Sequence, residues 1–271
     1  MLRGLIMGLV AAISLAALLL FMADMAKADT IVLDKDTVVV RGSFDGKMAG
    51  KFIMDVSKIE GDEVVVFIDS PGGSISALQE MQAFMVASGK EFTCISLFAA
   101  SAGSALFEQC DTRLVMRNGT LMFHNASYGL MAQPEPQVQT YNKYVLEIIK
   151  DLEVKNAKAL GQSYEEYRMS VRDDLWLFGD KAVSYKAADD VVDVTCSPEL
   201  FKIRTLETMR VFIFEIKLEW SGCPLITYPV SINGEEQMRH IKEPEEVKTL
   251  NSILMPRVEY IKWARKNNLS L

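Results

Sequence analysis

Short apolar runs alternate with segments of helical spacing between residues 30 and 195. Residues 64–68 read Val-Val-Val-Phe-Ile, a continuous apolar run typical of a strand that is covered on both faces. Further strands are predicted at residues 30–33, 37–41, 91–96, 112–116, 120–124 and 191–194. Helices are predicted at residues 46–59, 101–109, 136–160 and 181–188, after the Pro-Gly-Gly at 71–73, and after Ser163. This alternation of strands and helices predicts an α/β fold.

Local signals refine this outline at three places. Asn118-Gly119 predicts a tight turn between the strands at 112–116 and 120–124. Ser163 and Glu166 have the spacing of a capping box, which begins a helix. Beyond residue 199 we expect a strand at 211–220 and a last helix from Glu243 toward Trp263.

Three regions follow from this pattern. Residues 1–28 are treated as a targeting segment, residues 29–198 as the main domain, and residues 199–271 as a C-terminal extension docked on the core. The last region is shorter than most independent domains.

The N-terminal segment predicts export. Arg3 is followed by 18 uncharged, mostly apolar residues, 5–22, and then by Ala26-Lys27-Ala28, the small-x-small pattern that signal peptidase cleaves. Cleavage there would make Asp29 the first mature residue. The alternative is a retained membrane anchor, because 18 apolar residues just span a bilayer. In either case residues 29–271 lie outside the cytoplasm, in the periplasm or otherwise exported, with residues 5–22 anchored in the inner membrane if they are retained.

Composition sets broad limits on function. The 271 residues are 49% hydrophobic and 24% charged, which is enough for one core of ordinary size. The formal net charge of −7 argues against nonspecific binding of nucleic acid. The chain has no zinc-type cysteine pairing and no Walker loop, so neither a metal site nor a cofactor is expected.

The four cysteines permit two disulfides in an exported protein. Cys94 lies in a predicted strand, and Cys110 lies just past the helix that returns alongside it. We therefore favour Cys94–Cys110, which leaves Cys196–Cys223. The alternative is four buried free thiols.

The candidate chemistry lies between residues 69 and 124. Asp69-Ser-Pro-Gly-Gly73 offers glycine N–H groups, Ala99-Ala-Ser-Ala-Gly103 offers a hydroxyl among small residues, and Met122-Phe-His124 offers an imidazole. A serine nucleophile needs a base and preorganised donors for the oxyanion. The chain is therefore a serine hydrolase candidate.

Each of these features also has a structural explanation. The glycines suit any tight turn, and small residues around Ser101 allow close helix packing, with Ser104 as a competing nucleophile. His124 ends an apolar strand, where a histidine is often a core residue, although the only other histidine, His240, lies in a charged stretch. The carboxylate that would orient the imidazole is Asp173 or Asp174, and the residues alone do not choose between them.

Residues 64–195 resemble the Clp protease proteolytic subunit (ClpP) of the ClpP/crotonase fold. The resemblance rests on Ser70-Pro-Gly-Gly73, on Ala99-Ala-Ser101 with Gly103, and on Met122-Phe-His124. Gly161-Gln-Ser163 matches a segment that precedes the family's catalytic aspartate, and counting from it without gaps reaches Asp174. Downstream, residues 182–185 resemble the family's Ala-Val-Glu-Tyr segment.

The resemblance implies a fold of stacked strand and helix units with a long handle-type helix. It implies a triad of Ser101, His124 and Asp174, with the oxyanion bound by the backbone N–H groups of Gly73 and Ala102. The expected substrate is a peptide or an unfolded protein. The expected assembly is a homo-oligomer that meets along residues 136–160, with Tyr141, Val145 and Ile149 near the contact.

Some features depart from the family pattern. Ala102 stands where ClpP usually has methionine, and Asn125 replaces a familiar glutamine. Together with the export signal and the extension, these features resemble predicted periplasmic ClpP-like proteins. ClpP works with ATP-driven unfoldases, and the periplasm has no ATP, so that partnership is not expected. Two alternatives stay open: a non-catalytic ClpP-like assembly or peptide-binding protein, and a Ser–Lys dyad enzyme, which the register of His124 disfavours.

Overall fold

A computed structural model describes residues 29–128, 135–211 and 214–236. The strands of its main body are β1 (Thr30–Leu33), β2 (Val38–Phe44), β3 (Glu63–Gly73), β4 (Glu91–Ala100), β5 (Thr112–Phe123), β6 (Leu175–Phe178) and β7 (Asp190–Cys196). The helices are α2 (Gly46–Ser57), α3 (Ile75–Ser88), α4 (Ala102–Phe107), α5 (Glu135–Ala159), α6 (Tyr164–Ser170) and α7 (Asp180–Ser184).

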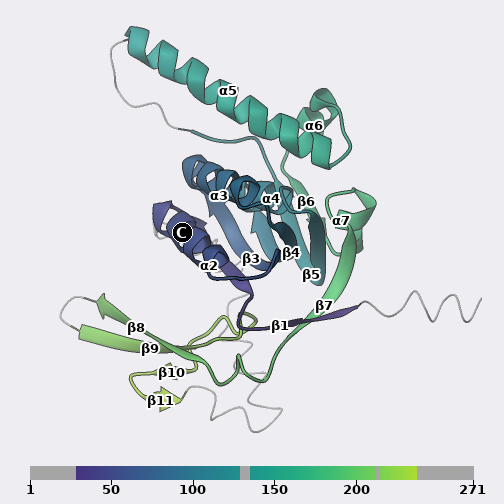
Figure 1. The fold of residues 1–271 in the computed structure, drawn as a ribbon. Helices are drawn as coiled ribbons and strands as arrows, with labels where there is room; N and C mark the ends of the chain where they lie inside the picture. Colours follow the sequence, from purple (N-terminus) through teal and green to yellow (C-terminus); the bar gives the residue numbers. More distant parts are fainter. Residues whose placement is uncertain (1–28, 129–134, 212–213, 237–271) are drawn as a thin grey trace, which may run out of the picture.

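The seven strands form one sheet in the order β1-β7-β5-β4-β3-β2, and β6 pairs with β5 (Figure 1). Every pair is parallel except β5 with β6. A helix connects β2 to β3, β3 to β4 and β4 to β5, because consecutive parallel strands need a crossover connection. The predicted α/β fold class is confirmed.

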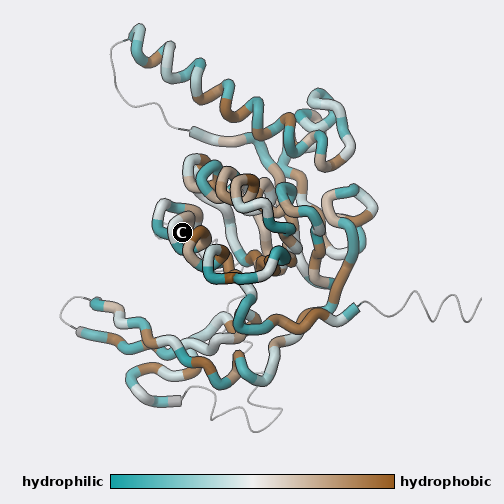
Figure 2. Tube along the Cα trace, viewed as in Figure 1, coloured by the Kyte–Doolittle hydropathy of each residue, from teal (hydrophilic) through white to brown (hydrophobic). Residues whose placement is uncertain are grey.

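Helices α2, α3 and α4 cover one face of the sheet, and the hydropathy colouring of Figure 2 places their apolar sides against it. Phe52, Leu78 and Leu106 of these helices are buried together with Val66 and Ile68 of β3. The opposite face carries a second cluster that includes Phe67, Ile95 and Val192, together with residues of the C-terminal extension. Burial of both faces explains why residues 64–68 read as a continuous apolar run.

Capping residues fix where several helices begin and end. The Asp45 carboxylate accepts from the Met48 N–H at 2.7 Å and begins α2. Gly89, in the left-handed region at φ 64°, ends α3. The predicted capping box is confirmed at α6, since the Ser163 and Glu166 side chains each accept from the other residue's backbone N–H.

The predicted turn at Asn118-Gly119 is wrong. Residues 112–123 form the single strand β5, and neither residue has the positive φ that the favoured two-residue hairpin turns need. Gly119 instead lies where β5 exchanges partners, since Leu114–Met116 pair with β7 and residues from Thr120 on pair with β6. A Cβ on Gly119 would lie 2.4 Å from the Ser96 carbonyl oxygen, so glycine is required by close packing against β4.

The predicted long helix is present as α5, but two of the apolar residues expected at a subunit contact face the protein's own core. Val145 and Ile149, expected near a subunit contact, are buried within this chain. They lie at four-residue spacing, together with Glu153 and Ala157, and this spacing gives α5 one inward face. Tyr141, by contrast, is 52% exposed and is available to a partner.

The C-terminal extension forms a second, four-stranded sheet of β8 (Arg204–Val211), β9 (Phe214–Ser221), β10 (Ser231–Ile232) and β11 (Glu235–Glu236). The single strand predicted at 211–220 is therefore corrected to a hairpin. The first strand was missed because its apolar residues Leu206 and Met209 are three apart and do not alternate.

The extension docks on the main sheet through Leu200 and Cys223, which pack with Phe67 and Ile95. The predicted signal segment and the helix from Glu243 lie outside the described residues. None of the helices in the described ranges is long and apolar enough to cross a membrane.

Candidate active site

Ser101 and His124 meet at the carboxyl ends of two neighbouring parallel strands. Ser101 joins β4 to α4, and His124 directly follows β5. The register pairs Ala100 with Met122, so the two side chains emerge at the same edge of the sheet. His124 Nε2 lies 2.7 Å from Ser101 Oγ, which is hydrogen-bond distance. The structure thus brings together the predicted nucleophile and base.

The backbone of Ser101 is held in an unusual conformation, with φ 57° and ψ −121°. Such a conformation costs a non-glycine residue about 1–3 kcal/mol and persists only when its surroundings enforce it. Here the Ser101 N–H donates to Met122 O at 2.9 Å. The Ser104 hydroxyl lies 2.7 Å from Ser101 O and 2.8 Å from Met122 O, so it holds the same junction.

The two candidate serines therefore differ in accessibility. Ser104 is 1% exposed and its hydroxyl proton is shared between two carbonyl oxygens. Ser101 is half-buried and faces the imidazole. This arrangement favours Ser101 as the nucleophile.

The Pro71-Gly72-Gly73 turn packs directly against the Ser101 junction. The Gly72 N–H donates to Ser70 Oγ at 3.0 Å, and that hydroxyl donates in turn to Gly42 O. Gly72 has φ +84°, and a Cβ there would lie 2.4 Å from Ala100 O and 2.7 Å from Ala102 N. Only glycine allows this approach, because any side chain would push the turn away from the junction.

A single cavity joins these parts. Its wall includes Gly73, Ser101, Ala102 and His124, the residues predicted as oxyanion donors, nucleophile and base. The rest of the wall comes from α3, α4, α5, α6 and the segment around His124: Ile75, Leu78, Ser104, Ala105, Phe123, Ala126, Ile149, Leu152, Glu153, Asn156 and Tyr167. A reacting carbonyl group placed at Ser101 would lie in this cavity.

Sequence reasoning missed the polar part of this wall. Glu153 is 5% exposed, and its carboxylate accepts from Tyr164 Oη at 3.0 Å and from Arg168 Nη1 at 2.8 Å. Asn156 Nδ2 donates to the Tyr167 hydroxyl at 3.1 Å, and burial raises the pKa of Tyr167 to about 12. A carboxylate on the otherwise apolar inward face of α5 was the signal that could have found this group.

The two candidate aspartates differ in their surroundings. Asp173 is exposed and pairs with Arg172, whose hydrogen bond holds the pKa of that carboxyl below its usual value. Asp174 has φ 60° and immediately precedes Leu175, which pairs with Phe123. Within the described residues the Asp174 carboxylate makes no hydrogen bond to His124. The assignment of Asp174 stays a prediction.

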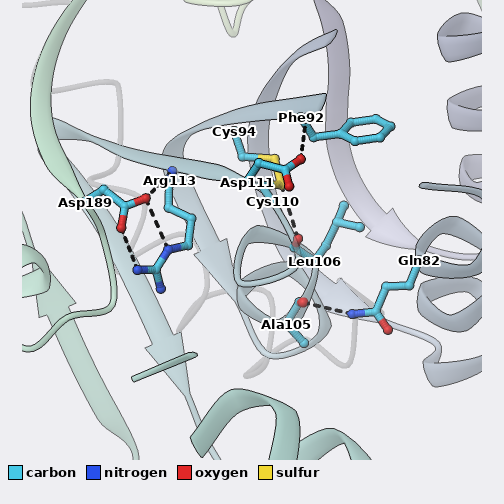
Figure 3. The surroundings of a disulfide bond; sticks show 9 residues. All are labelled: Gln82, Phe92, Cys94, Ala105, Leu106, Cys110, Asp111, Arg113 and Asp189. Carbon is cyan, nitrogen blue, oxygen red and sulfur yellow. Dashed lines mark hydrogen bonds and ion pairs between the residues drawn. A yellow bond between two sulfur atoms is a disulfide. The ribbon is translucent and has the colours of Figure 1, made fainter. Parts of the chain in front are cut away.

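The cysteines pair as expected, Cys94 with Cys110 and Cys196 with Cys223, with Cα atoms 5.9 and 5.8 Å apart. Figure 3 shows what surrounds the first pair. The Asp111 carboxylate accepts from the Phe92 N–H at 2.8 Å, and Gln82 Nε2 donates to Ala105 O at 3.0 Å. These contacts tie the end of α4, the helix that begins after Ser101, to β4 and α3.

An ion network with a buried member, Glu108, lies at the same end of α4. Glu108 directly follows α4, and its carboxylate pairs with the Arg113 guanidinium, which also binds Asp189 at 2.6 Å (Figure 3 draws the Arg113–Asp189 pair). The Glu108 Oε1 atom is buried and has no hydrogen-bond partner. Burial raises the pKa of Glu108 to about 8, although Arg113 acts in the opposite direction.

The sequence model described as Clp protease matches residues 22–195 of this chain. The chain belongs to the Clp protease family. The match contains the whole strand–helix body from β1 to α7, including Ser101, His124 and the Gly-Gly turn. This Clp protease family member continues past residue 195 into the extension, which lies outside the match.

Two curated bacterial proteins are similar over the same body. One is the ATP-dependent Clp protease proteolytic subunit 2 of Pseudomonas aeruginosa, 26% identical over 173 residues that cover 62% of this chain and 86% of that protein. The other is the ATP-dependent Clp protease proteolytic subunit 1 of Bifidobacterium longum, 25% identical over 154 residues that cover 56% of this chain and 66% of that protein. Both similarities support the family assignment and the resemblance drawn from the motifs.

Proposed function

We propose that this member of the Clp protease family is an exported serine peptidase that hydrolyses peptide bonds through Ser101. The observation that carries the proposal is the 2.7 Å contact between Ser101 Oγ and His124 Nε2 at the wall of a cavity. A hydroxyl becomes a useful nucleophile when an adjacent imidazole accepts its proton. The family assignment supports the same chemistry.

In the proposed reaction, Ser101 Oγ attacks the peptide carbonyl carbon while His124 Nε2 takes the hydroxyl proton. The backbone N–H groups of Gly73 and Ala102 stabilise the tetrahedral oxyanion. His124 then gives the proton to the leaving amine, which departs and leaves an acyl-enzyme. In the second half, water attacks the acyl carbon while His124 takes a proton from it, and His124 returns that proton to Ser101 Oγ as the acid product leaves. Asp174 would hold the imidazole in the correct tautomer and stabilise its cation.

The dyad alternative has less support. A Ser–Lys enzyme needs a neutral lysine amine beside the nucleophile to accept its proton, and no lysine is found among the described residues that line the cavity with Ser101. The imidazole already occupies the position that such a lysine would need.

The second candidate function is a non-catalytic ClpP-like assembly or peptide-binding protein. It is favoured by one observation: in the described residues, Asp174 makes no hydrogen bond to the imidazole. A site without an oriented base could still bind peptides in the same cavity.

A fluorophosphonate probe distinguishes the two functions. The full chain, in detergent if its N-terminal segment is retained, should be labelled at Ser101, and Ser101→Ala and His124→Ala should abolish labelling. Ser104→Ala should keep most of the labelling, since Ser104 only supports the junction. A folded protein with no labelling would overturn the peptidase proposal, and labelling lost in Ser104→Ala but kept in Ser101→Ala would reassign the nucleophile.

The proposed location is the periplasm or another exported compartment, with peptides or unfolded proteins as substrates and no nucleic-acid partner. Both relatives carry ATP-dependent in their names, but an exported chain has no ATP supply, so we propose no unfoldase partner. Mass spectrometry of protein from its native compartment tests export. A mature N-terminus at Asp29 would support cleavage, and retention of residues 5–22 would show a membrane anchor.

A further inference from the structure

The cavity beside Ser101 contains a buried carboxylate that the proposed reaction does not use. Glu153 is 5% exposed, far less than an ordinary glutamate, and lies on the inward face of α5 with Val145, Ile149 and Ala157. It lines the same cavity as Ser101 and His124. A buried charge is costly unless it is paired, and Glu153 meets this condition through Arg168 and Tyr164. The cavity wall therefore holds a paired carboxylate on the α5 side.

The remaining wall suits a long hydrocarbon chain. Ile75 and Leu78 come from α3, Phe123 precedes His124, and Ile149 and Leu152 come from α5. These residues are apolar, whereas Glu153 and Asn156 introduce polar groups on the α5 side. Lysine and arginine side chains have the matching composition, with a methylene stem that packs on apolar surface and a cationic head.

The existing partners of Glu153 leave capacity for another donor. One carboxylate oxygen accepts from Tyr164 and the other from Arg168, while an ionised carboxylate offers about four acceptor positions. The Arg168 side chain is 46% exposed and the Glu153 side chain 6%, so the guanidinium approaches from the solvent side. Among the described residues that line the cavity, His124 is the only basic one.

We propose that Glu153 makes this peptidase selective for substrates with lysine or arginine on the amino-terminal side of the scissile bond. The proposal rests on the peptidase function proposed above, with Ser101 as nucleophile. The substrate side chain would extend along the apolar wall and place its ammonium or guanidinium group at the Glu153 carboxylate. A charge-assisted hydrogen bond is stronger than one between neutral groups.

The test uses two fluorogenic peptides that differ only in the residue before the scissile bond, lysine in one and norleucine in the other. Norleucine keeps the four-carbon stem and removes the charge. We expect the full-length protein to cleave the lysine peptide with a kcat/KM about tenfold higher, or about 1.4 kcal/mol in transition-state binding. Equal cleavage, or a preference for norleucine, would overturn the proposal.

Variants assign the preference to Glu153. Glu153→Gln should lower kcat/KM for the lysine peptide about tenfold and change the norleucine value little, because only the charged pair is lost. Glu153→Asp keeps the carboxylate and should keep a lysine preference. Glu147→Gln, the same change on the exposed side of α5, is the matched control and should change neither value. A lysine preference that survives in folded Glu153→Gln would also reject the assignment.

Fluorophosphonate labelling separates this inference from the proposed function. Labelled Ser101 with cleavage of the norleucine peptide but no lysine preference would refute the role of Glu153 alone. Absence of labelling together with absence of cleavage of both peptides would refute the peptidase function itself. If Glu153→Gln does not fold, equal cleavage of the two peptides by the unmodified protein still refutes the role of Glu153, and loss of the lysine preference in Glu153→Asp would contradict it as well.

Discussion

Phe123 of β5 lies opposite Leu175 of β6 in antiparallel register, so the next residues at the same end of the pair are His124 and Asp174. This relationship places the predicted orienting carboxylate across from the base, even though no hydrogen bond joins them. We predict that Asp174→Asn lowers kcat by about 10⁴-fold, as expected when an imidazole loses the carboxylate that sets its tautomer. Asp173→Asn, at the exposed partner of Arg172, should have a mild effect. A fully active Asp174→Asn would reject the assignment.

The Gly-Gly turn gives a second prediction. Gly72→Ala should abolish labelling of Ser101, because the added methyl group would meet Ala100 O and Ala102 N on either side of the nucleophile. The matched control is Gly50→Ala in the middle of α2, where nothing lies near the new Cβ. That control should be neutral or stabilise the fold by up to about 1 kcal/mol through helix propensity. Labelling and thermal unfolding of both variants check this, and a normally labelled Gly72→Ala would contradict it.

The two disulfides should differ in their effects on the site. A disulfide typically contributes about 2–4 kcal/mol to stability. Replacing Cys94 and Cys110 by alanine should lower both the melting temperature and the fraction of labelled Ser101, because that pair braces α4. Replacing Cys196 and Cys223 should lower the melting temperature with less effect on labelling. Mass spectrometry should find no free thiols in protein from its native compartment. Four free thiols there would show that neither disulfide forms.

Glu108 predicts a pH dependence of stability. Its pKa in the folded chain is raised to about 8 from 4.5, chiefly by burial, so the folded state holds a proton that the unfolded state has lost between these values. Its contribution to stability is therefore complete below about pH 4.5 and is lost as pH rises toward 8. The free energy of unfolding, measured with urea, should fall as pH rises from 5 to about 8. In Glu108→Gln this fall should be smaller. The control Asp193→Asn affects an exposed carboxyl whose pKa is lowered, and it should leave the slope unchanged.

Self-association should depend on the exposed side of α5. Tyr141 is 52% exposed, so Tyr141→Glu should weaken a homo-oligomer without unfolding the chain. Val145 is buried within the chain, so Val145→Ser should lower stability instead. Light scattering and thermal unfolding separate the two effects. A monomer at micromolar concentration with full activity would show that no assembly is needed.

Most of the strand and helix pattern could be predicted because each element carries a local signal. Residues 64–68 are buried on both faces and read as continuously apolar, and α6 begins at a complete capping box. The pattern misled at Asn118-Gly119, where glycine is required by a neighbouring backbone and not by a turn. It also could not show that Val145 and Ile149 are covered by their own chain, because a spacing of four residues defines a face but not what packs on it.

Only part of the candidate site could be predicted from the sequence. Motif spacing found Ser101 and His124, whose contact depends on strand order and register that no short segment contains. Residue types alone did not separate Ser101 from Ser104, but burial and the two carbonyl contacts of the Ser104 hydroxyl do. Glu153 was missed because its importance comes from the wall that it shares with Ser101, about 50 residues earlier in the chain.

The docking of the extension changes how the protein can be dissected. Pro224 O accepts from Arg41 Nη2, and Arg41 Nε donates at 3.2 Å to Asp69, the residue immediately before the Ser-Pro-Gly-Gly segment. A protein shortened to the family-matched region would lose this support and would bare Phe67 and Ile95 on the far face of the sheet. Residues 199–236 thus support the sheet that carries Ser101 and His124, and we expect any fragment designed to test the proposed activity to need them.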